Sequence, residues 1–138
     1  MNNVKGEFYM VSSSSPPIVL VIDDNPLNQE LLKIFLSALS CEGVGLTTGD
    51  DVTDMVKRYR PAVVLMDIQM AGLSGFDALA ELKADVETRD VPVYAFTALT
   101  PQKLADYGDL SLFSGVLRKP PMIEDVRKIL EAVGAVYA

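Results

Sequence analysis

Histidine is missing from this chain of 138 residues, and cysteine occurs once, at Cys41. Without histidine the chain cannot form a Ser-His-Asp or Cys-His catalytic group, an imidazole zinc site or a phosphohistidine. A single cysteine cannot make an internal disulfide, which is typical of proteins in a reducing compartment. No apolar segment approaches the roughly 18 residues of a membrane span. The sequence therefore predicts a soluble, cytoplasmic protein whose chemistry uses carboxylates, hydroxyls, lysine or a bound metal.

Positive charge is also scarce, because 12 Lys and Arg residues against 19 Asp and Glu residues give a formal net charge of −7. Duplex DNA carries about one negative charge per 1.7 Å, so we expect this chain not to bind nucleic acid. Hydrophobic residues make up 49% of the chain and charged residues 22%, which favours a folded core over disorder. The length fits one domain.

Residues 1–17 are typical of a flexible tail, because they lack a sustained periodicity and end in four serines and two prolines. Residues 18–138 are expected to form one domain in which strands and helices alternate. The predicted strands are 18–22, 43–48, 62–66, 91–96 and a short one at 116–117. The predicted helices are 26–40, 51–59, 74–84, 101–107 and 120–133. This alternation favours a parallel sheet covered by helices on both faces.

Apolar patterning within these elements predicts which residues are buried. Residues 18–22 form a continuous apolar run rich in β-branched side chains, typical of a strand buried on both faces. Asn25 and Pro26 predict the cap and first position of a helix. The apolar residues that recur at helical spacing after this cap are Leu27, Leu31, Ile34, Phe35, Ala38 and Leu39. In the weakly patterned segment 97–119, three residues are expected in the core, with an interface as the alternative: Tyr107, Leu112 and Phe113.

Polar side chains follow four of the five predicted strands, at the edge where the carboxyl ends of parallel strands meet. These residues are Asp23, Asp24, Asp67, Thr97 and Lys119. Taken singly, each has an ordinary explanation as a turn, a loop residue, a strand former or a surface charge. Taken together, they place three carboxylates, a hydroxyl and an ammonium at the edge where open α/β sheets bind ligands.

Three carboxylates at one edge repel one another unless a cation lies between them. With oxygen ligands and no histidine, such a site favours Mg²⁺ or Mn²⁺ over zinc. Mg²⁺ usually keeps several waters and accepts phosphate oxygens, so the site is suited to receive a phosphoryl group. Asp67 is the candidate nucleophile, because it stands alone at the end of the central strand and leaves Asp23 and Asp24 for the metal.

These residues resemble the receiver domain of two-component response regulators, and the resemblance covers residues 18–133. The motifs that carry it are the acidic pair Asp23–Asp24, the segment Met66–Met70 around the phosphorylated aspartate, Gly75 eight residues after Asp67, Thr97–Ala98, and Lys119–Pro120 with its usual cis peptide. The resemblance implies a flavodoxin-like, or CheY-like, doubly wound sheet of five parallel strands in the order 2-1-3-4-5, with helices on both faces.

The same resemblance implies a phosphorelay function, in which Asp67 accepts a phosphoryl group from a sensor histidine kinase or a histidine phosphotransfer protein. The implied ligands of Mg²⁺ are Asp24, Asp67, the backbone carbonyl of Gln69 and, partly through water, Asp23. Thr97 and Lys119 would bind the phosphoryl oxygens. Movement of Thr97 would then change the surface of the fourth helix, fifth strand and fifth helix, where an unknown downstream protein would bind.

Two positions depart from the family's pattern. The proline that usually follows the phosphorylated aspartate by four residues is replaced by Ala71, which removes a backbone constraint. The aromatic residue that usually stands three positions before the lysine is replaced by Val116. Since that aromatic normally follows the threonine inward on activation, we expect the switch formed by Thr97 and Val116 to be weaker or built differently.

More than one function is compatible with the sequence. No output domain follows Ala138, which favours a single-domain response regulator that signals by protein contact or relays the phosphoryl group, and not an enzyme. The main alternative is a degenerate receiver that binds partners without phosphorylation, favoured by Val116 and opposed by the complete set of polar site residues. A phosphatase of the haloacid dehalogenase type would need a second aspartate where Asn25 or Gln69 stands. A nucleotide- or flavin-binding module would need a phosphate-binding glycine loop, which the sequence lacks.

Overall fold

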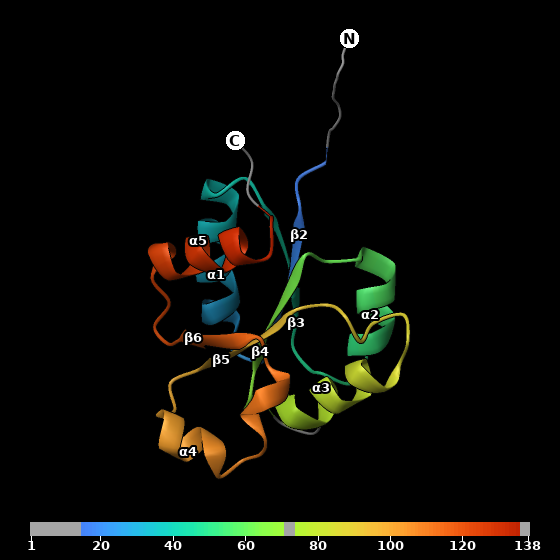
Figure 1. Ribbon diagram of the computed structural model, residues 1–138. Coiled ribbons are helices and arrows are strands. Elements are labelled where there is room, and N and C mark those ends of the chain that lie inside the picture. Colours follow the sequence, from blue (N-terminus) through green and yellow to red (C-terminus); the bar gives the residue numbers. More distant parts are fainter. Residues whose placement is uncertain (1–14, 71–73, 136–138) are drawn as a thin grey trace.

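Apolar strands and amphipathic helices alternate along the chain to give a three-layer structure in this computed structural model, which describes residues 15–70 and 74–135 (Figure 1). The strands are β2 (Ile18–Ile22), β3 (Glu42–Leu46), β4 (Val63–Asp67), β5 (Val93–Thr97) and β6 (Gly115–Arg118). The helices are α1 (Pro26–Ala38), α2 (Val52–Tyr59), α3 (Gly75–Ala84), α4 (Pro101–Ala105), the 3₁₀ turn η2 (Leu110–Leu112) and α5 (Ile123–Ala132). Ala71 and most of the predicted tail, residues 1–14, lie outside the described residues.

The five strands pair in parallel, in the order β3-β2-β4-β5-β6. Numbered along the chain, this is the order 2-1-3-4-5, so the predicted flavodoxin-like topology is confirmed. The chain forms β3 on one side of β2 and then returns to form β4 on the other side. The strand order therefore reverses between β2 and β4, and the carboxyl ends of these two strands are the place where open α/β sheets bind ligands.

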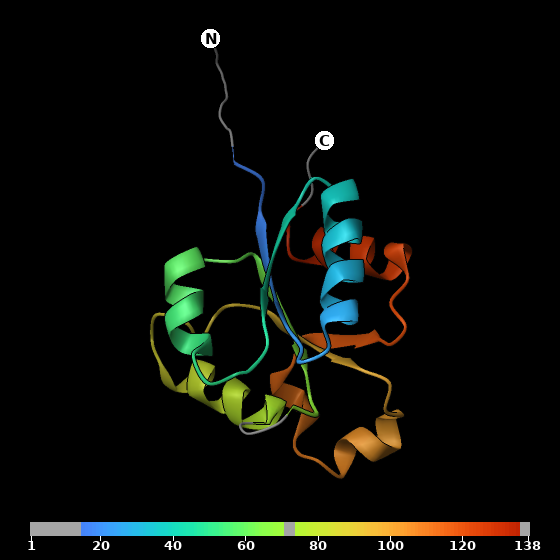
Figure 2. The same cartoon turned by 180° about the vertical axis from the view of Figure 1, so that it is seen from behind.

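Helices α1 and α5 cover one face of the sheet and α2 and α3 cover the other, as opposite views show (Figures 1 and 2). Because successive side chains of a strand point to opposite faces, each face has its own apolar core. The core under α1 and α5 includes Val21, Leu32, Leu36, Phe96, Leu117 and Val126. The core under α2 and α3 includes Val56, Met66, Leu79, Leu82, Leu104 and Phe113. Since Leu104 belongs to α4, this short helix also packs on the second face.

Helix α1 begins as predicted, and the predicted residues Phe35 and Leu39 pack against the core, but the fully buried residues are not among those predicted. The side chain of Asn25 accepts a hydrogen bond from the Leu27 N–H at 2.9 Å and so caps the helix. The fully buried residues are Leu32 and Leu36, whereas Leu27 and Ile34 are 77% and 62% exposed. Apolar residues therefore recur at helical spacing along two adjacent lines of this helix. Spacing alone does not show which of the two lines faces the sheet.

The segment between β5 and β6 contains the predicted short helix, α4, which ends two residues earlier than predicted. The turn η2, which follows it, was not predicted. Phe113 is buried and packs edge-on against Phe76, with ring centroids 5.3 Å apart. The prediction that Tyr107 and Leu112 belong to the core is wrong, because about half of each side chain is exposed.

The last helix also begins later than predicted. Its first residue is Ile123, so Pro120 and Pro121 precede the helix instead of opening it. The Lys119–Pro120 peptide bond is cis, as the resemblance implied. None of the helices among the described residues has the length and apolar character needed to cross a membrane.

Candidate functional site

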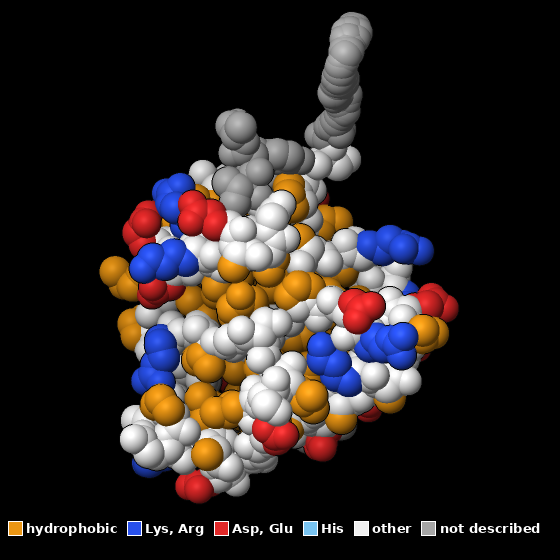
Figure 3. Space-filling model, in the orientation of Figure 1, with side chains coloured by type: hydrophobic (Ala, Val, Ile, Leu, Met, Phe, Trp, Pro, Cys, Tyr) orange, Lys and Arg blue, Asp and Glu red, His pale blue; other side chains and the backbone are white. Residues whose placement is uncertain are grey.

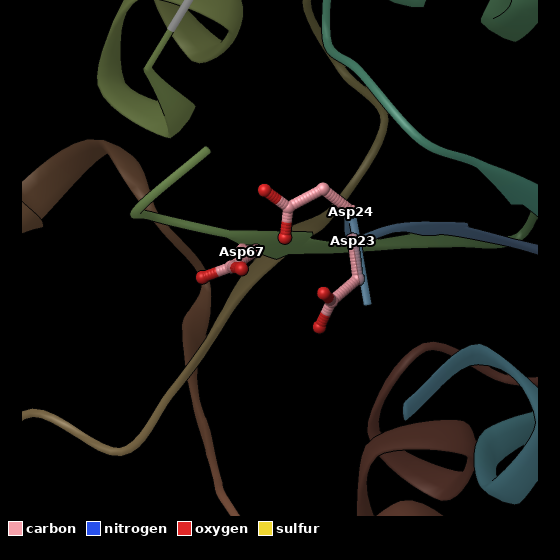
Figure 4. Close-up of side chains that lie close together, drawn as sticks. All are labelled: Asp23, Asp24 and Asp67. Carbon is pink, nitrogen blue, oxygen red and sulfur yellow. The ribbon is translucent and has the colours of Figure 1, made fainter. Parts of the chain in front are cut away.

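Three aspartates converge at the carboxyl edge of the sheet, at the point where the strand order reverses. Asp67 is the last residue of β4, and Asp23 and Asp24 directly follow the neighbouring strand β2. One carboxylate oxygen from each lies within 4.8 Å of the other two, and Figure 4 shows the three side chains gathered at the ends of these strands. Asp23 and Asp67 are buried, whereas Asp24 is exposed. The cluster therefore has one solvent-facing carboxylate and two that the protein encloses.

Asp23 is held in place by donors from the first turns of α1. Its Oδ1 accepts from the Asn25 N–H at 2.8 Å, and its Oδ2 accepts from Asn28 Nδ2 at 3.1 Å. The side-chain Nε2 of Gln29 donates to the backbone carbonyls of Asp23 and Leu46, both at 2.7 Å, and so links the ends of β2 and β3. Both oxygens of Asp23 are thus engaged by protein donors, which supports the expectation that this residue acts on a metal partly through water.

Asp67 combines a buried carboxylate with two donors. Its Oδ1 accepts from the Gln69 N–H at 3.1 Å, and its Oδ2 lies 3.3 Å from the Nζ of Lys119. Burial raises the pKa of the Asp67 carboxyl above its ordinary value, and the Gln69 N–H and the Lys119 charge only partly oppose this effect. The protein therefore leaves a negative charge at Asp67 incompletely compensated, and an added cation would complete the compensation.

Lys119 lies between the two buried carboxylates. Its Nζ is 3.0 Å from Asp23 Oδ2 and 3.3 Å from Asp67 Oδ2, and its side chain is 19% exposed. The Nζ also lies 4.7 Å from the centroid of the Phe96 ring. Because its backbone N–H donates to the Thr97 carbonyl at 2.9 Å, the residue stays fixed at the end of β6. The structure thus brings the predicted lysine into direct contact with two of the three aspartates.

Thr97 ends β5 at the same edge and is buried. Its Oγ1 accepts a hydrogen bond from the Leu99 N–H at 3.0 Å. A hydroxyl that accepts one hydrogen bond still has its own hydrogen to donate. Thr97 therefore has a donor available at the edge where the aspartates gather.

Gly75 shows why a residue without a side chain stands eight positions after Asp67. A Cβ at position 75 would lie 2.5 Å from the Asp67 carbonyl oxygen and 3.0 Å from the Ile68 Cα. The Gly75 N–H donates to the Ile68 carbonyl at 3.2 Å, so α3 begins directly against the end of β4. A side chain at position 75 would therefore push the start of α3 away from the end of β4.

Gly75→Ala is expected to lower the free energy of unfolding by about 1–3 kcal/mol, because the added methyl group meets backbone atoms that cannot move aside. Urea unfolding of the two proteins measures the difference. Gly43→Ala is the matched control, because a Cβ there first meets side-chain atoms, Lys33 Cγ at 3.0 Å and Leu36 Cδ1 at 3.1 Å, and not backbone. Equal losses in the two variants would contradict the tight approach of α3 to Asp67.

Several contacts at this edge were not predicted from the sequence. The amide Nε2 of Gln69 donates to the hydroxyl of Tyr107 at 2.9 Å. Asn28 and Gln29 support Asp23, as described above, and their place in the first turns of a predicted helix was the only signal for them. The guanidinium of Arg118 donates to the carbonyls of Ala98 and Leu99. For Tyr107 and Arg118 the sequence carried no spacing signal. The metal-binding role of the Gln69 carbonyl stays a prediction.

Comparison with known proteins adds the following similarities. A family model described as response regulator receiver domain matches residues 19–131. The polar-differentiation response regulator DivK of Brucella anthropi is 30% identical over 119 residues, which cover 83% of this chain and 97% of that protein. The receiver domain of the sensor histidine kinase PA1611 of Pseudomonas aeruginosa, solved with a magnesium ion coordinated in its active site cleft, matches with a TM-score of 0.75 and 26% identity, covering 87% of this chain and 99% of that one.

The chemotaxis protein CheY4 of Vibrio cholerae matches with a TM-score of 0.76 and 21% identity, over 86% of this chain and 99% of that one. At this identity the likeness concerns the fold alone. The family-model match spans β2 to α5, so it includes every strand end that contributes to the acidic cluster.

Proposed function

Because this chain belongs to the response regulator receiver domain family of two-component signalling, we propose that it is a phosphoacceptor whose Asp67 takes a phosphoryl group from a histidine-containing donor protein. The observation that carries the proposal is the convergence of three carboxylates within 4.8 Å of one another, with the Lys119 ammonium in contact with two of them. Carboxylates this close repel one another, so the site favours an added cation and, with it, a phosphoryl group.

The transfer step follows from the arrangement of these groups. A carboxylate oxygen of Asp67 attacks the phosphorus of the donor's phosphohistidine, so that an O–P bond forms and the P–N bond breaks, and the electron pair of that bond stays on the imidazole nitrogen. Lys119 and the Thr97 hydroxyl bind phosphoryl oxygens, and their positive charge and donated hydrogen bond stabilise the transferred group. The protein's contribution is therefore positioning and charge compensation.

The donor set fits magnesium. The cluster offers oxygen ligands alone, and hard divalent cations such as Mg²⁺, with Mn²⁺ as a substitute, prefer such ligands. In this proposal Asp24, Asp67 and the backbone carbonyl of Gln69 hold the ion, with Asp23 acting partly through water. When bound, Mg²⁺ would supply positive charge to the phosphoryl oxygens. The magnesium ion in the cleft of the Pseudomonas aeruginosa receiver domain supports this assignment.

Intact mass spectrometry tests the proposal. The protein is incubated with Mg²⁺ and a small phosphodonor such as acetyl phosphate, and a parallel sample contains a chelator. We expect the mass of one added phosphoryl group with Mg²⁺ and no change with the chelator. An unchanged mass despite measured Mg²⁺ binding would favour the alternative, a receiver fold that binds partners without phosphorylation.

An exposed apolar stripe on α1 supports a protein as the phosphodonor. Leu27 and Ile34 are 77% and 62% exposed, and Leu31 between them is partly exposed. Helix α1 begins two residues after Asp24, so its first turn lies at the rim of the acidic cluster. A donor that presents a phosphohistidine to Asp67 must cover this rim, and the stripe offers it apolar surface to bury. We propose a separate surface for the downstream protein, formed by α4, β6 and α5. Val116 is 41% exposed on this face.

Changing both Leu27 and Ile34 to Glu is expected to slow phosphoryl transfer from a donor protein by about tenfold or more, because two contact residues lose their apolar burial. The rate with the small phosphodonor should stay unchanged, since that reaction needs no docking surface. Both rates are measured by intact mass, with any sensor kinase that phosphorylates the unmodified chain. Val86→Glu, which alters a side chain 70% exposed between α3 and β5, is the control. If both phosphorylation rates fell equally, the substitutions would have disturbed the acidic site itself and not the docking of the donor protein.

A further inference from the structure

Arg118 occupies the same side of strand β6 as Val116. Along β6 the side chains of Val116 and Arg118 are exposed, whereas that of Leu117 between them is buried, as expected for alternation along a strand. Figure 3, in the orientation of Figure 1, shows apolar side chains over the middle of the visible face and separate Lys or Arg groups around them.

The guanidinium of Arg118 holds the backbone that directly follows Thr97. It donates to the carbonyl of Leu99 and, at 3.4 Å, to the carbonyl of Ala98. Thr97 is paired with Arg118 in the sheet register, so the side chain needs only to reach across one strand. A planar guanidinium with several fixed donors suits two neighbouring carbonyl oxygens in a way that a single ammonium does not.

The same turn fixes the hydroxyl of Thr97. Its Oγ1 accepts from the Leu99 N–H at 3.0 Å, while the Leu99 carbonyl accepts from Arg118. The backbone of Leu99 therefore contacts both side chains: its carbonyl accepts from Arg118, and its N–H donates to Thr97.

We propose that Arg118 is a positioning residue for Thr97: it holds the turn 97–99 in the arrangement in which the Thr97 hydroxyl accepts from the Leu99 N–H. The inference rests on the proposed function, because its consequence is that phosphorylation of Asp67 and the Arg118 contact are linked. When the Thr97 side chain moves so that its hydroxyl reaches a phosphoryl oxygen, its Oγ1 draws away from the Leu99 N–H. The peptide group that carries this N–H also carries the Ala98 carbonyl, so its shift changes the contact with Arg118. Linkage is reciprocal, so weakening the Arg118 contact favours the phosphorylated arrangement.

Beryllofluoride with Mg²⁺, which mimics a phosphoryl group on a carboxylate, tests the linkage without donor chemistry. Arg118→Met removes the donors and keeps an apolar stem, and we expect it to bind beryllofluoride about three- to tenfold more tightly than the unmodified chain, a factor typical of lost surface hydrogen bonds. Arg118→Lys should show a smaller gain in beryllofluoride affinity, because lysine keeps the positive charge but lacks the paired N–H donors of the guanidinium. Arg127→Met is the matched control, since Arg127 is exposed on α5 and pairs with Glu124.

A second readout needs no ligand. Hydrogen exchange of the Leu99 amide, measured by NMR, should be faster in Arg118→Met and unchanged in Arg127→Met. Equal beryllofluoride affinities of the unmodified chain and Arg118→Met, or an unchanged Leu99 exchange rate, would overturn the inference and leave the phosphoacceptor function intact. Failure of the unmodified chain to bind beryllofluoride with Mg²⁺ would overturn the proposed function and this inference together.

Discussion

Asp67→Asn is expected to reduce phosphoryl incorporation by at least about 100-fold, to the background of the assay, because an amide oxygen is a poor nucleophile at phosphorus. The experiment is the incubation with Mg²⁺ and a small phosphodonor, followed by intact mass over time. The substitution changes one atom of a side chain that is 5% exposed, so it leaves the packing of β4 in place. Loss of the signal therefore reports on chemistry at Asp67.

The matched control is Asp54→Asn, which makes the same chemical change at an exposed position in the first turn of α2. We expect this variant to take up one phosphoryl group at the rate of the unmodified chain. Incorporation into Asp67→Asn at the rate of the unmodified chain would show that another residue accepts the group. Peptide mapping of the phosphorylated product would then identify that residue.

Asp67→Asn is also expected to change the free energy of unfolding, and the pKa of the Asp67 carboxyl determines in which direction. Burial raises the pKa of the Asp67 carboxyl above its ordinary value of 3.8, so folding favours the neutral form of this group. Its stabilising contribution is complete below the ordinary pKa and is lost as the pH rises through the raised pKa of the folded protein. In a chelator at neutral pH, Asp67→Asn should therefore be more stable to urea than the unmodified chain. This advantage should disappear in acid, and a variant that is less stable at neutral pH would contradict it.

The backbone arrangement of the site followed from the sequence for a simple physical reason. Parallel strands place all their carboxyl ends at one edge, so the aspartates after β2 and at the end of β4 had to come close once the strands were identified. Continuous apolar runs identified these strands, because a strand covered by helices on both faces has no polar side. Gly75 could be matched by its spacing from Asp67, and the structure adds the reason, which is the 2.5 Å approach that a Cβ would make to the Asp67 carbonyl.

Side-chain contacts between distant loops could not be predicted in this way. Tyr107 reaches Gln69 across 38 positions of the chain, and Arg118 reaches Leu99 across 19. Neither contact depends on a periodicity or a motif, since each is set by where the segment between β5 and β6 folds back over the site. That segment was also the place where the predicted core was wrong. Tyr107 is exposed there because its hydroxyl bonds to Gln69 at the rim, while Phe113 fills the space under Phe76.

Lys119→Met is expected to lower the free energy of unfolding by about 3 kcal/mol in a chelator, because removing one partner of a buried ion pair costs about 3–5 kcal/mol. Asp23 is fully buried, and its Oδ2 would lose the ammonium now 3.0 Å away. Donors from Asn25 and Asn28 remain on this carboxylate, which keeps the loss at the lower end of that range. Methionine retains the length of the side chain against Phe96, so the change reports on charge. Urea unfolding measures it, with Lys128→Met on the exposed side of α5 as the control.

Magnesium separates this electrostatic explanation from a packing defect. A cation that binds the folded protein alone stabilises it by about 2.7 kcal/mol at 100 times its dissociation constant. If Lys119 compensates the aspartates, Lys119→Met should bind Mg²⁺ more tightly than the unmodified chain and should regain much of its lost stability as Mg²⁺ is added. Phosphoryl incorporation should stay slow even then, because the ammonium that binds a phosphoryl oxygen is missing. A stability loss that Mg²⁺ does not reduce would mean that Lys119 supports the fold through its packing, and that the aspartates tolerate one another without a cation.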